Sequence, residues 1–352
     1  MSDISQKLKE QIETAISDKT TLNIIGGNSK SFYGRTPQGE PIYVGEQTGI
    51  TNYEFTELVM TVRAGTTLEE IECALDKNGQ MLAFEPPRYG ASATIGGTIA
   101  CNLSGPRRAY AGAARDYVLG SKIINGKAEV LSFGGEVMKN VAGYDVSRLM
   151  TGAMGTLGLL LEVSFKVLPK PISEKTLTLE VNSSDAILKM NQWATKTFPL
   201  SATVYVDGKL YVRLSGAESS VQSAFQQMGG EVFSEADLFW QNLKEQQLSF
   251  FKTAETLWRI SVPPTTSQLE LSGECLMEWS GGLRWLKTND NPEHIRQIVS
   301  AVGGQATLFK GHVNNQSVFQ SLSPNLEKLH RNLKSAFDPH QIFNPGRLYE
   351  SL

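Results

Sequence analysis

The sequence predicts an α+β fold in which a cofactor-binding domain precedes a second, smaller domain. The segment 94–171 is rich in glycine, small residues, amides and hydroxyls, and it ends in apolar, strand-like stretches. Residues 172–318 follow the order strand–helix–strand–strand–helix–strand, which is the ferredoxin-like pattern. The chain has 352 residues, of which 40% are hydrophobic, so two or three domains with a sizeable core are expected.

Charge and cysteine content exclude several classes of protein. The formal net charge is −3 and no run of lysine or arginine stands out, which argues against a nucleic-acid-binding protein. The three cysteines, Cys73, Cys101 and Cys275, are far apart and form no C-x-x-C. A zinc ribbon or a self-contained iron–sulfur cluster is therefore not expected. Few, widely spaced cysteines are typical of proteins of the reducing cytoplasm and not of a disulfide framework.

The first residues predict an amphipathic helix instead of a signal peptide. Ile4, Leu8, Ile12 and Ile16 recur at a spacing of four. The longest apolar run, residues 157–167, is interrupted by charge and glycine and is far shorter than the roughly 20 apolar residues of a membrane span. Any membrane association is expected to depend on a partner.

The first third of the chain predicts an α/β unit. Residues 22–25 form a short buried strand that runs into the loop Gly26-Gly27-Asn28-Ser29-Lys30, where small residues suit a phosphate group. A tight turn without a ligand is the alternative for this loop. Residues 58–62 predict a second strand. Thr67 begins a helix with a capping box, and Gly79 ends it.

Two common nucleotide-binding motifs are absent from the sequence. No G-x-x-x-x-G-K-[ST] occurs, so a P-loop is excluded. Glycines recur at every third position in 152–158, but this segment precedes the strand-like residues 159–167. A dinucleotide-binding fingerprint of the Rossmann type requires the opposite order.

The second domain begins after Pro169 and Pro171 and contains two similar halves. The first half has a hairpin signal, Asp207-Gly208, between alternating strands. Its elements are strand 177–181, a helix from Ser183, strands 203–206 and 210–214, a helix through Gln227 and strand 231–233. A weaker second copy has strands 258–262, 276–279 and 283–286, a helix from Pro292 and strand 306–309. A helical segment, 322–344, is expected to return to the first domain.

Several ordered blocks resemble the vanillyl-alcohol-oxidase/PCMH-type family of FAD-binding flavoproteins. They include IGGNS at 25–29, TIGG at 94–97, KNVAGYD at 139–145, GTLG at 155–158 and FNPGR at 343–347. Within that family, GGNSK, EPPRYG, GPRR and GGEVMKNVAGYD make the chain most similar to the E subunits of bacterial glycolate oxidases. The resemblance implies a PCMH-type FAD-binding domain of two α/β subdomains over 1–171, a cap domain over 172–318 and a C-terminal segment, 319–352, that returns to the FAD domain.

The same resemblance implies which residues bind FAD. The family's two glycine-rich loops hold the diphosphate with main-chain N–H groups. Further residues of the FAD site lie along the flavin. The expected residues are Gly26, Gly27, Asn28, Ser29, Thr94, Ile95, Gly96, Gly97, Asn102, Ser104, Gly105, Arg107, Leu119, Gly143, Tyr144, Asp145, Thr156, Leu157 and Gly158. No histidine precedes His294, so the FAD is expected to be held non-covalently.

Oxidation of a hydroxy acid requires a cation for the carboxylate and a base for the hydroxyl proton. Arginine suits the carboxylate because its planar fork pairs in bidentate fashion. The candidates are Arg107, Arg108, Arg284 and Arg347, each with a surface ion pair as the alternative, and His312 is the candidate base. Related D-2-hydroxyacid flavoproteins carry a histidine-rich block here, whereas this chain has only Gly311-His312, so no metal site is expected. A sister subunit is therefore expected to carry the catalytic site.

The sequence thus predicts an FAD-binding subunit of a multi-subunit glycolate oxidase. The complex would oxidise glycolate to glyoxylate and pass electrons through an iron–sulfur subunit to the respiratory chain. Two alternatives stay open: a structural subunit with weak or absent flavin, and a stand-alone FAD oxidoreductase of another small 2-hydroxy acid. The expected location is the cytoplasm, with peripheral association to the inner membrane through partners.

Overall fold

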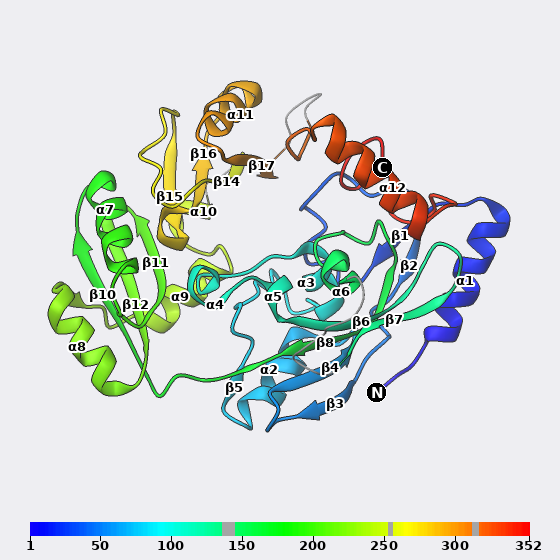
Figure 1. Ribbon diagram of the computed structural model, residues 1–352, viewed down its shortest axis with the longest axis horizontal. Helices are drawn as coiled ribbons and strands as arrows, with labels where there is room; N and C mark the ends of the chain where they lie inside the picture. Colours follow the sequence, from blue (N-terminus) through cyan, green and yellow to red (C-terminus); the bar gives the residue numbers. More distant parts are fainter. Residues whose placement is uncertain (136–144, 253–255, 312–316) are drawn as a thin grey trace. The chain divides into compact units, whose positions relative to one another are not determined.

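The computed structural model describes residues 1–352 apart from 136–144, 253–255 and 312–316 (Figure 1). The chain divides into two units. The first comprises 1–103, 113–169 and 321–352, and the second comprises 104–112 and 170–320. The segment 104–112 lies inside the part of the chain for which the sequence predicted a single FAD-binding domain. The contacts that assign this segment to the second unit join residues far apart in sequence. Local composition therefore does not reveal the assignment.

The first unit contains three sheets and the helices around them. A five-stranded antiparallel sheet has the order β3-β4-β8-β6-β7, and β1 pairs in parallel with β2. The elements are α1 (Ser5–Asp18), β1 (Leu22–Ile25), β2 (Glu40–Tyr43), β3 (Ile50–Glu54), β4 (Val59–Arg63), α2 (Leu68–Asp76), β5 (Gln80–Met81), α3 (Ile95–Cys101), α5 (Ala114–Tyr117), β6 (Val118–Ile124), β7 (Val130–Gly134), α6 (Val146–Met150), β8 (Leu159–Lys166), β9 (Leu168–Pro169) and α12 (Pro324–Phe337).

The central strand β8 explains where the core of this unit lies. Leu159, Leu161, Val163 and Phe165 are fully buried, and Leu160 on the other face is only 8% exposed. A strand that is buried on both faces belongs in the middle of a sheet, and β8 indeed pairs with β4 and β6. The predicted helix cap also forms, since Thr67 Oγ1 accepts a hydrogen bond from the Glu70 N–H at 3.2 Å.

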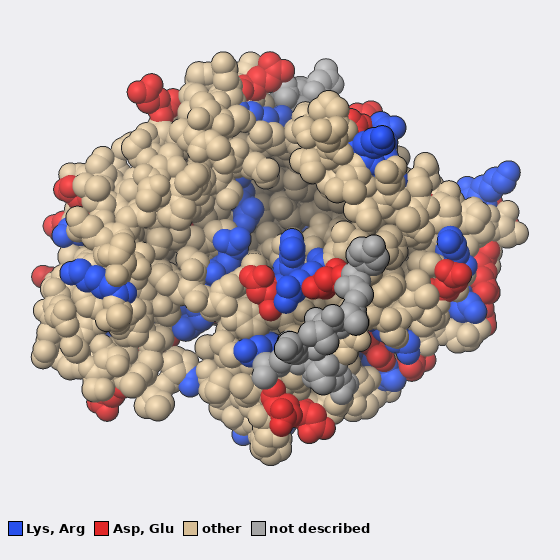
Figure 2. Space-filling model, in the orientation of Figure 1, with Lys and Arg blue, Asp and Glu red and all other residues tan. Residues whose placement is uncertain are grey.

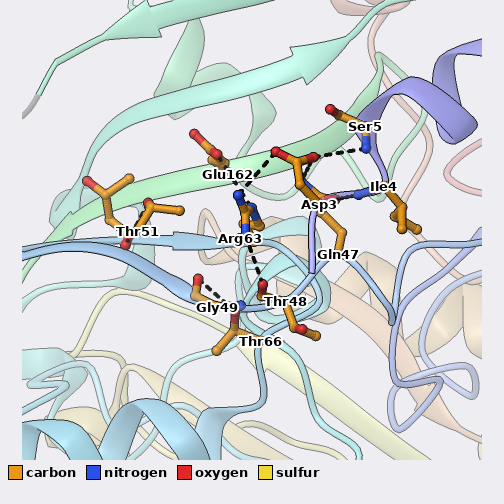
Figure 3. A network of polar contacts seen from close by, with 11 residues as sticks. Asp3, Ile4, Ser5, Gln47, Thr48, Gly49, Thr51, Arg63, Thr66 and Glu162 are labelled. Carbon is orange, nitrogen blue, oxygen red and sulfur yellow. Dashed lines mark hydrogen bonds and ion pairs between the residues drawn. The ribbon is translucent and has the colours of Figure 1, made fainter. Parts of the chain in front are cut away.

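The amino-terminal residues are tied to β4 by a polar network around Arg63 (Figure 3). Arg63 Nη2 lies 3.1 Å from Asp3 Oδ2, and its other guanidinium nitrogens reach Thr48 and Glu162. The Asp3 carboxylate also accepts hydrogen bonds from the Ser5 N–H at 3.0 Å and from Gln47 Nε2 at 3.2 Å. These contacts, with that of the Ser5 N–H the largest, lower the pKa of Asp3 to about 2.

The carboxy-terminal residues are held by a buried ion pair on α12. Lys334 Nζ lies 2.7 Å from Asp338 Oδ2, and it also donates to the carbonyls of Thr156 and Phe343. Asp338 accepts hydrogen bonds from two later main-chain N–H groups, those of Ile342 and Phe343. The predicted helix 322–344 is shorter than expected because Pro339 follows Asp338, and a helix ends before such a residue.

The second unit is built on one eight-stranded sheet. Its order is β13-β10-β12-β11-β15-β16-β14-β17. The elements are α4 (Arg108–Ala111), β10 (Ser173–Glu180), α7 (Ser183–Ala194), β11 (Leu200–Val206), β12 (Lys209–Gly216), α8 (Glu218–Met228), β13 (Glu231–Val232), α9 (Ala236–Lys244), α10 (Ser249–Lys252), β14 (Leu257–Ser261), β15 (Glu274–Glu278), the 3₁₀ turn η1 (Trp279–Gly281), β16 (Leu283–Lys287), α11 (Pro292–Ala301) and β17 (Gln305–Lys310).

The two halves of this sheet are ferredoxin-like copies joined through β11 and β15. In the first half, α7 and α8 pack with the sheet around one apolar cluster that includes Met190, Leu210 and Val221. In the second half, α11 packs with β14, β16 and β17. The second copy lacks its first helix, because residues 262–273 between β14 and β15 form neither helix nor strand. The helices α9 and α10 are additions that the sequence pattern did not predict.

The described surface and helices show how charged and apolar residues are distributed. On the face drawn in Figure 2, described Lys and Arg residues alternate with Asp and Glu in small groups, and most of the visible surface belongs to neither kind. Among the described residues, every helix is too short or too polar to cross a bilayer.

Candidate cofactor and substrate site

The first glycine-rich loop presents free main-chain donors. It follows β1 directly and comprises Gly26, Gly27, Asn28 and Ser29. None of the four N–H groups donates a hydrogen bond to another described residue. Asn28 lies in the left-handed region with φ of 57°, which turns the loop sharply. Successive free N–H groups around such a residue form a concave anion-binding nest.

Two buried cations lie beside this loop. Lys30 is 6% exposed and its Nζ lies 3.3 Å from the Arg88 carbonyl oxygen. Arg347 is 8% exposed and donates to the carbonyls of Tyr33 at 2.6 Å and Ser31 at 3.2 Å. Both side chains line a cavity of about 100 Å³ with the loop, and no Asp or Glu is among its lining residues. Burial lowers the pKa of Arg347, as expected of a cation without a carboxylate partner.

The second glycine-rich loop has a different role from the one expected. Its N–H groups are already used within the protein: Ile95 donates to Thr66 at 3.0 Å, Gly96 to Ala64 at 2.8 Å, and Gly97 to Thr94 Oγ1 at 3.2 Å. A Cβ atom at Gly96 would lie 2.8 Å from the Ala64 side chain, so glycine is needed there for close packing. The segment Thr94–Gly97 therefore forms a wall of the site, and the N–H groups of its last three residues are not available as such donors.

The cavity beside the first loop continues through the first unit. A narrower apolar cavity of about 70 Å³ shares Gly26, Thr94, Gly97 and several other residues with it. Ala153 in turn lines both that cavity and a larger one of about 420 Å³. The larger cavity is lined by Arg115, Arg148, His330 and Lys334, by the carboxylate of Asp145 and by apolar residues. The three cavities thus form a row in which each shares wall residues with the next.

Most of the expected cofactor residues come together along this row. Gly26, Gly27, Asn28, Ser29, Thr94 and Gly97 line the first cavity, Gly96 and Gly158 the second, and Asp145, Thr156 and Leu157 the third. Ile95 is fully buried in the core, and neither Leu119 of β6 nor Asn102 lines any of the three. Ser104, Gly105 and Arg107 belong to the second unit. Gly143 and Tyr144 lie outside the described residues.

Asn102 gives an independent indication of a ligand. It follows α3 in the left-handed conformation, with φ of 51°. Its Oδ1 is buried and accepts no hydrogen bond from the described residues. Because buried polar atoms are almost always paired, this oxygen is expected to accept a hydrogen bond from a bound molecule. Free main-chain donors, two cations, an apolar channel and an unpaired acceptor fit a dinucleotide such as FAD.

The structure describes two of the three expected catalytic residues, and these two belong to different units. Arg347 lines the cavity beside the first glycine-rich loop. Arg284 is on β16 of the second unit, 2% exposed, and its guanidinium donates to main-chain carbonyls. His312 lies outside the described residues. The described residues contain no group of three or more His, Cys, Asp or Glu that could hold a metal ion.

Arg107 is committed to the second unit in this structure. Its Nη2 lies 2.8 Å from Glu174 Oε2, and Arg213 Nε lies 3.8 Å from the other oxygen of the same carboxylate. Trp279 Nε1 donates to the Gly105 carbonyl at 3.0 Å. These contacts hold the segment 104–112 against the sheet of that unit.

Sequence reasoning overlooked Arg259 on β14. The side chain is half-buried and its guanidinium lies 5.3 Å from the Trp279 ring. Within the described residues it makes no hydrogen bond and no ion pair. It pairs in register with Trp285 and Thr307, so it lies on the sheet face opposite to α7 and α11. The available signal was a charged residue at the centre of a predicted apolar strand, which is costly without a partner or a ligand.

A strained turn lies next to Arg259. Trp279, Ser280 and Gly281 have φ values of 55°, 57° and 89°, and the first two are unusual for residues with side chains. The Ser280 hydroxyl lies 2.6 Å from the Tyr110 hydroxyl, and burial raises the pKa of Tyr110. Such strain persists where surrounding contacts impose it, and it is frequent near functional sites.

Comparison with known proteins identifies the family. Residues 5–134 match the family described as FAD binding domain. The glycolate oxidase subunit GlcE of Escherichia coli (strain K12) is 49% identical over 350 residues, which cover 99% of both chains. The glycolate oxidase subunit GlcD of Bacillus subtilis (strain 168) is 36% identical over 129 residues, covering 37% of this chain and 27% of that protein. The D-lactate dehydrogenase of Anaerostipes hadrus is 31% identical over 44% of this chain and 32% of its own.

Solved structures agree on the fold. A p-cresol methylhydroxylase structure with substrate bound matches with a TM-score of 0.71, covering 98% of this chain and 87% of its own at 14% identity. An alkyldihydroxyacetonephosphate synthase matches with a TM-score of 0.69. The match covers 97% of this chain and 76% of the synthase chain at 13% identity. These likenesses confirm the predicted PCMH-type fold. The match to GlcE covers nearly the whole of both chains, and the FAD binding domain is recognised within this one. The chain therefore belongs to the family of the glycolate oxidase subunit GlcE.

Proposed function

We propose that this chain is an FAD-binding subunit of a glycolate oxidase complex that oxidises glycolate to glyoxylate. The observation that carries the proposal is the pairing of four free N–H groups, Gly26 to Ser29, with the buried cations Lys30 and Arg347 in one cavity without acidic residues. This arrangement supports binding of a diphosphate. The relationship to GlcE supports the choice of glycolate as the substrate.

The residues of the first unit would hold the cofactor by charge and by hydrogen bonding. The N–H groups of the first loop would donate to the diphosphate oxygens, while Lys30 and Arg347 offset their charge. Asn102 Oδ1 would accept a hydrogen bond from the bound cofactor. No histidine precedes His294, which supports non-covalent attachment. FAD, when bound, supplies a two-electron acceptor for oxidation of the hydroxy acid.

Arg259 is the residue that we propose for the substrate carboxylate. It is half-buried, without an ionic partner among the described residues, and held beside the Trp279 ring. A guanidinium in this condition gains a bidentate partner when a carboxylate binds. Of the sequence-based candidates for catalysis, His312 remains the proposed base, Arg347 is assigned to the diphosphate, and Arg284 donates to main-chain carbonyls.

The proposed assembly includes a sister FAD subunit and an iron–sulfur subunit. The sequence contains no C-x-x-C, which supports an iron–sulfur cluster carried by a partner. The similarity to GlcD over 129 residues supports a related sister subunit. Through these partners the complex would pass electrons to the respiratory chain at the inner membrane.

The experiment is to purify the full chain alone and then with its partners. We expect a yellow protein with flavin absorbance near 450 nm (roughly, as for flavins in general) that releases all its flavin on acid precipitation. Purification without flavin, with no uptake of added FAD, would support the structural-subunit alternative and overturn the proposal. Flavin that stays on the precipitated chain would contradict non-covalent attachment. Reduction by glycolate of the isolated chain, compared with the complex, distinguishes stand-alone from assembled activity.

A further inference from the structure

A cavity of about 240 Å³ lies within the second unit and shares no lining residue with the three cavities of the first unit. Its walls come from β11, β14, β15 and β16, from the start of α7 and from the irregular segment 262–273. The walls are mainly apolar. The apolar and aromatic side chains that form them are Tyr205, Ile260, Leu269, Leu271, Met277 and Leu286.

The duplicated architecture explains why this cavity exists. In the first half of the sheet, α7 connects β10 to β11 and covers the apolar face. The corresponding connection between β14 and β15 is the segment 262–273, which is neither helix nor strand. Of this segment, Val262 is buried in the α11 cluster, and Leu269 and Leu271 pack against that cluster while only partly buried. The irregular segment therefore covers the sheet less completely than a helix would, and a cavity remains beneath it.

Arg284 brings a buried positive charge to this cavity. It is 2% exposed and lines the cavity from β16. Its Nε donates to the Gly281 carbonyl at 3.3 Å, Nη1 to the Ser267 carbonyl at 2.7 Å, and Nη2 to the Thr266 carbonyl. Five N–H groups are present on a guanidinium, so one on Nη1 and one on Nη2 remain. No carboxylate among the described residues pairs with it.

The electrostatic surroundings favour an anion. None of the residues that line the cavity is Asp or Glu. Ser183, which lines it, is the first residue of the 12-residue helix α7, so the positive end of that helix dipole is directed there. A buried charge without a counter-charge is costly, and an anion that binds beside Arg284 removes this cost.

This cavity and the proposed substrate residue lie on opposite faces of one sheet. Arg284 is in register with Ile260 and Met277, which pack against the helices α11 and α7 respectively. Arg259 is in register with Trp285 on the other face. A ligand of the cavity would therefore leave Arg259 available.

We propose that the cavity binds a small aliphatic monocarboxylate. The carboxylate accepts hydrogen bonds from Nη1 and Nη2 of Arg284, and the alkyl chain lies against Ile260, Met277 and Leu286. The volume corresponds to about eight water molecules at about 30 Å³ each. A six-carbon acid such as hexanoate, with about eight non-hydrogen atoms, is of matching size.

The test is calorimetric titration of the full chain with hexanoate, hexan-1-ol and hexylammonium at neutral pH. We expect hexanoate to bind with a stoichiometry of one and at least about tenfold more tightly than either control, since one charge-assisted contact to a buried arginine is worth about that factor or more. Equal affinity for hexanoate and hexan-1-ol would overturn the proposal, because the cavity would then select only for apolar shape.

Variants and labelling locate the bound acid. Leu271→Trp fills the cavity and should abolish hexanoate binding, whereas Arg259→Gln on the opposite face should retain it. The reverse result would assign hexanoate to the substrate site and contradict the proposal. Should Leu271→Trp fail to fold, protection of Cys275, an exposed cysteine that lines the cavity, tests the same point in the unmodified chain.

In the labelling experiment, hexanoate should slow the reaction of N-ethylmaleimide with Cys275 at least about fivefold at saturation. The exposed Cys73 belongs to the first unit and serves as the internal control in the same molecule. Peptide mass spectrometry separates the two. Equal rates at Cys275 with and without saturating hexanoate would reject the site.

Discussion

Arg259 and Arg284 lie on neighbouring strands of one sheet and face opposite sides of it. Arg284 is fixed by three main-chain carbonyls, whereas the Arg259 guanidinium contacts only the Trp279 ring among the described residues. The same residue type thus has two different roles within one unit. Arg284 orders a loop and keeps two N–H groups for the proposed monocarboxylate, whereas Arg259 is available to the substrate.

Replacement of Arg259 is expected to weaken the action of the complex on glycolate. In Arg259→Gln, loss of a bidentate carboxylate contact should lower kcat/KM about 30-fold or more, since truncation of such a pair costs about 2–5 kcal/mol. Arg259→Lys should recover only part of this, because it keeps charge but loses the fork. Steady-state kinetics of the assembled complex with glycolate measure kcat/KM for each variant.

A matched control exists in the same unit. Arg296 also stacks on a tryptophan, Trp258, on the other face of the sheet. Arg296→Gln should leave kcat/KM nearly unchanged. If both variants behave like the unmodified protein, Arg259 does not bind the substrate, and the carboxylate is held elsewhere in the complex.

Replacement of Lys30 is expected to weaken flavin binding. Lys30→Met removes a buried cation from the cavity with the free N–H groups, and a hydrogen bond to a charged group is worth about 1.5–3 kcal/mol. The dissociation constant for FAD should therefore rise at least about tenfold, which fluorescence titration of the flavin-free chain measures. Lys7→Met changes an exposed residue of α1 and should have no effect. Unchanged affinity in Lys30→Met would remove Lys30 from the cofactor site.

The ion pair between Lys334 and Asp338 is expected to contribute strongly to stability. Both side chains are buried, and removal of one partner leaves a buried charge uncompensated. Asp338→Ala should lower the free energy of unfolding of the first unit by about 3–5 kcal/mol. Urea denaturation followed by circular dichroism measures this change.

The same helix provides the comparison. Glu327 and Arg331 form an exposed pair at the same spacing of four residues. Glu327→Gln should cost far less than Asp338→Ala, because solvent screens an exposed ion pair. Equal effects of the two substitutions would mean that burial does not determine the strength of the pair at Asp338.

Asp3 is expected to contribute stability that acid removes. Its pKa in the folded protein is about 2, below the ordinary value of 3.8. A depressed folded pKa means that the contribution is complete above the ordinary value and is lost as the pH falls from about 4 towards 2. Asp3→Asn should therefore lower the thermal midpoint at pH 6 but have little effect near pH 2. Asp18→Asn, an exposed change of equal charge, is the control. A difference that persists near pH 2 would assign the effect to something other than ionisation.

The sequence was most informative where a signal is local. The hairpin at Asp207-Gly208, the Thr67 cap and the glycine stops identified most strands and helices, because such signals act within a few residues. The second ferredoxin-like copy was recognisable for the same reason. The short helices α9 and α10 were missed because neither has a strong cap or a stop signal.

The sequence was less informative where long-range geometry decides. A glycine-rich loop indicates close approach of the main chain, but the residues do not reveal where the N–H groups point. Thus the loop after β1 keeps its donors free, while the N–H groups of Ile95 and Gly96 are used by Thr66 and Ala64. Arg259 was read only as part of a strand, because its lack of a partner is visible only in three dimensions.

The path of the chain has a consequence for inheritance and for engineering. The chain passes between the two units at 103–104, 112–113, 169–170 and 320–321. Removal of 170–320 would therefore leave residues 104–112 without Glu174, Trp279 and the sheet that they contact. The second unit therefore cannot be removed or exchanged as one continuous segment. Recombination that replaces 170–320 alone would join a new sheet to the old segment 104–112, so the two units are expected to be inherited together.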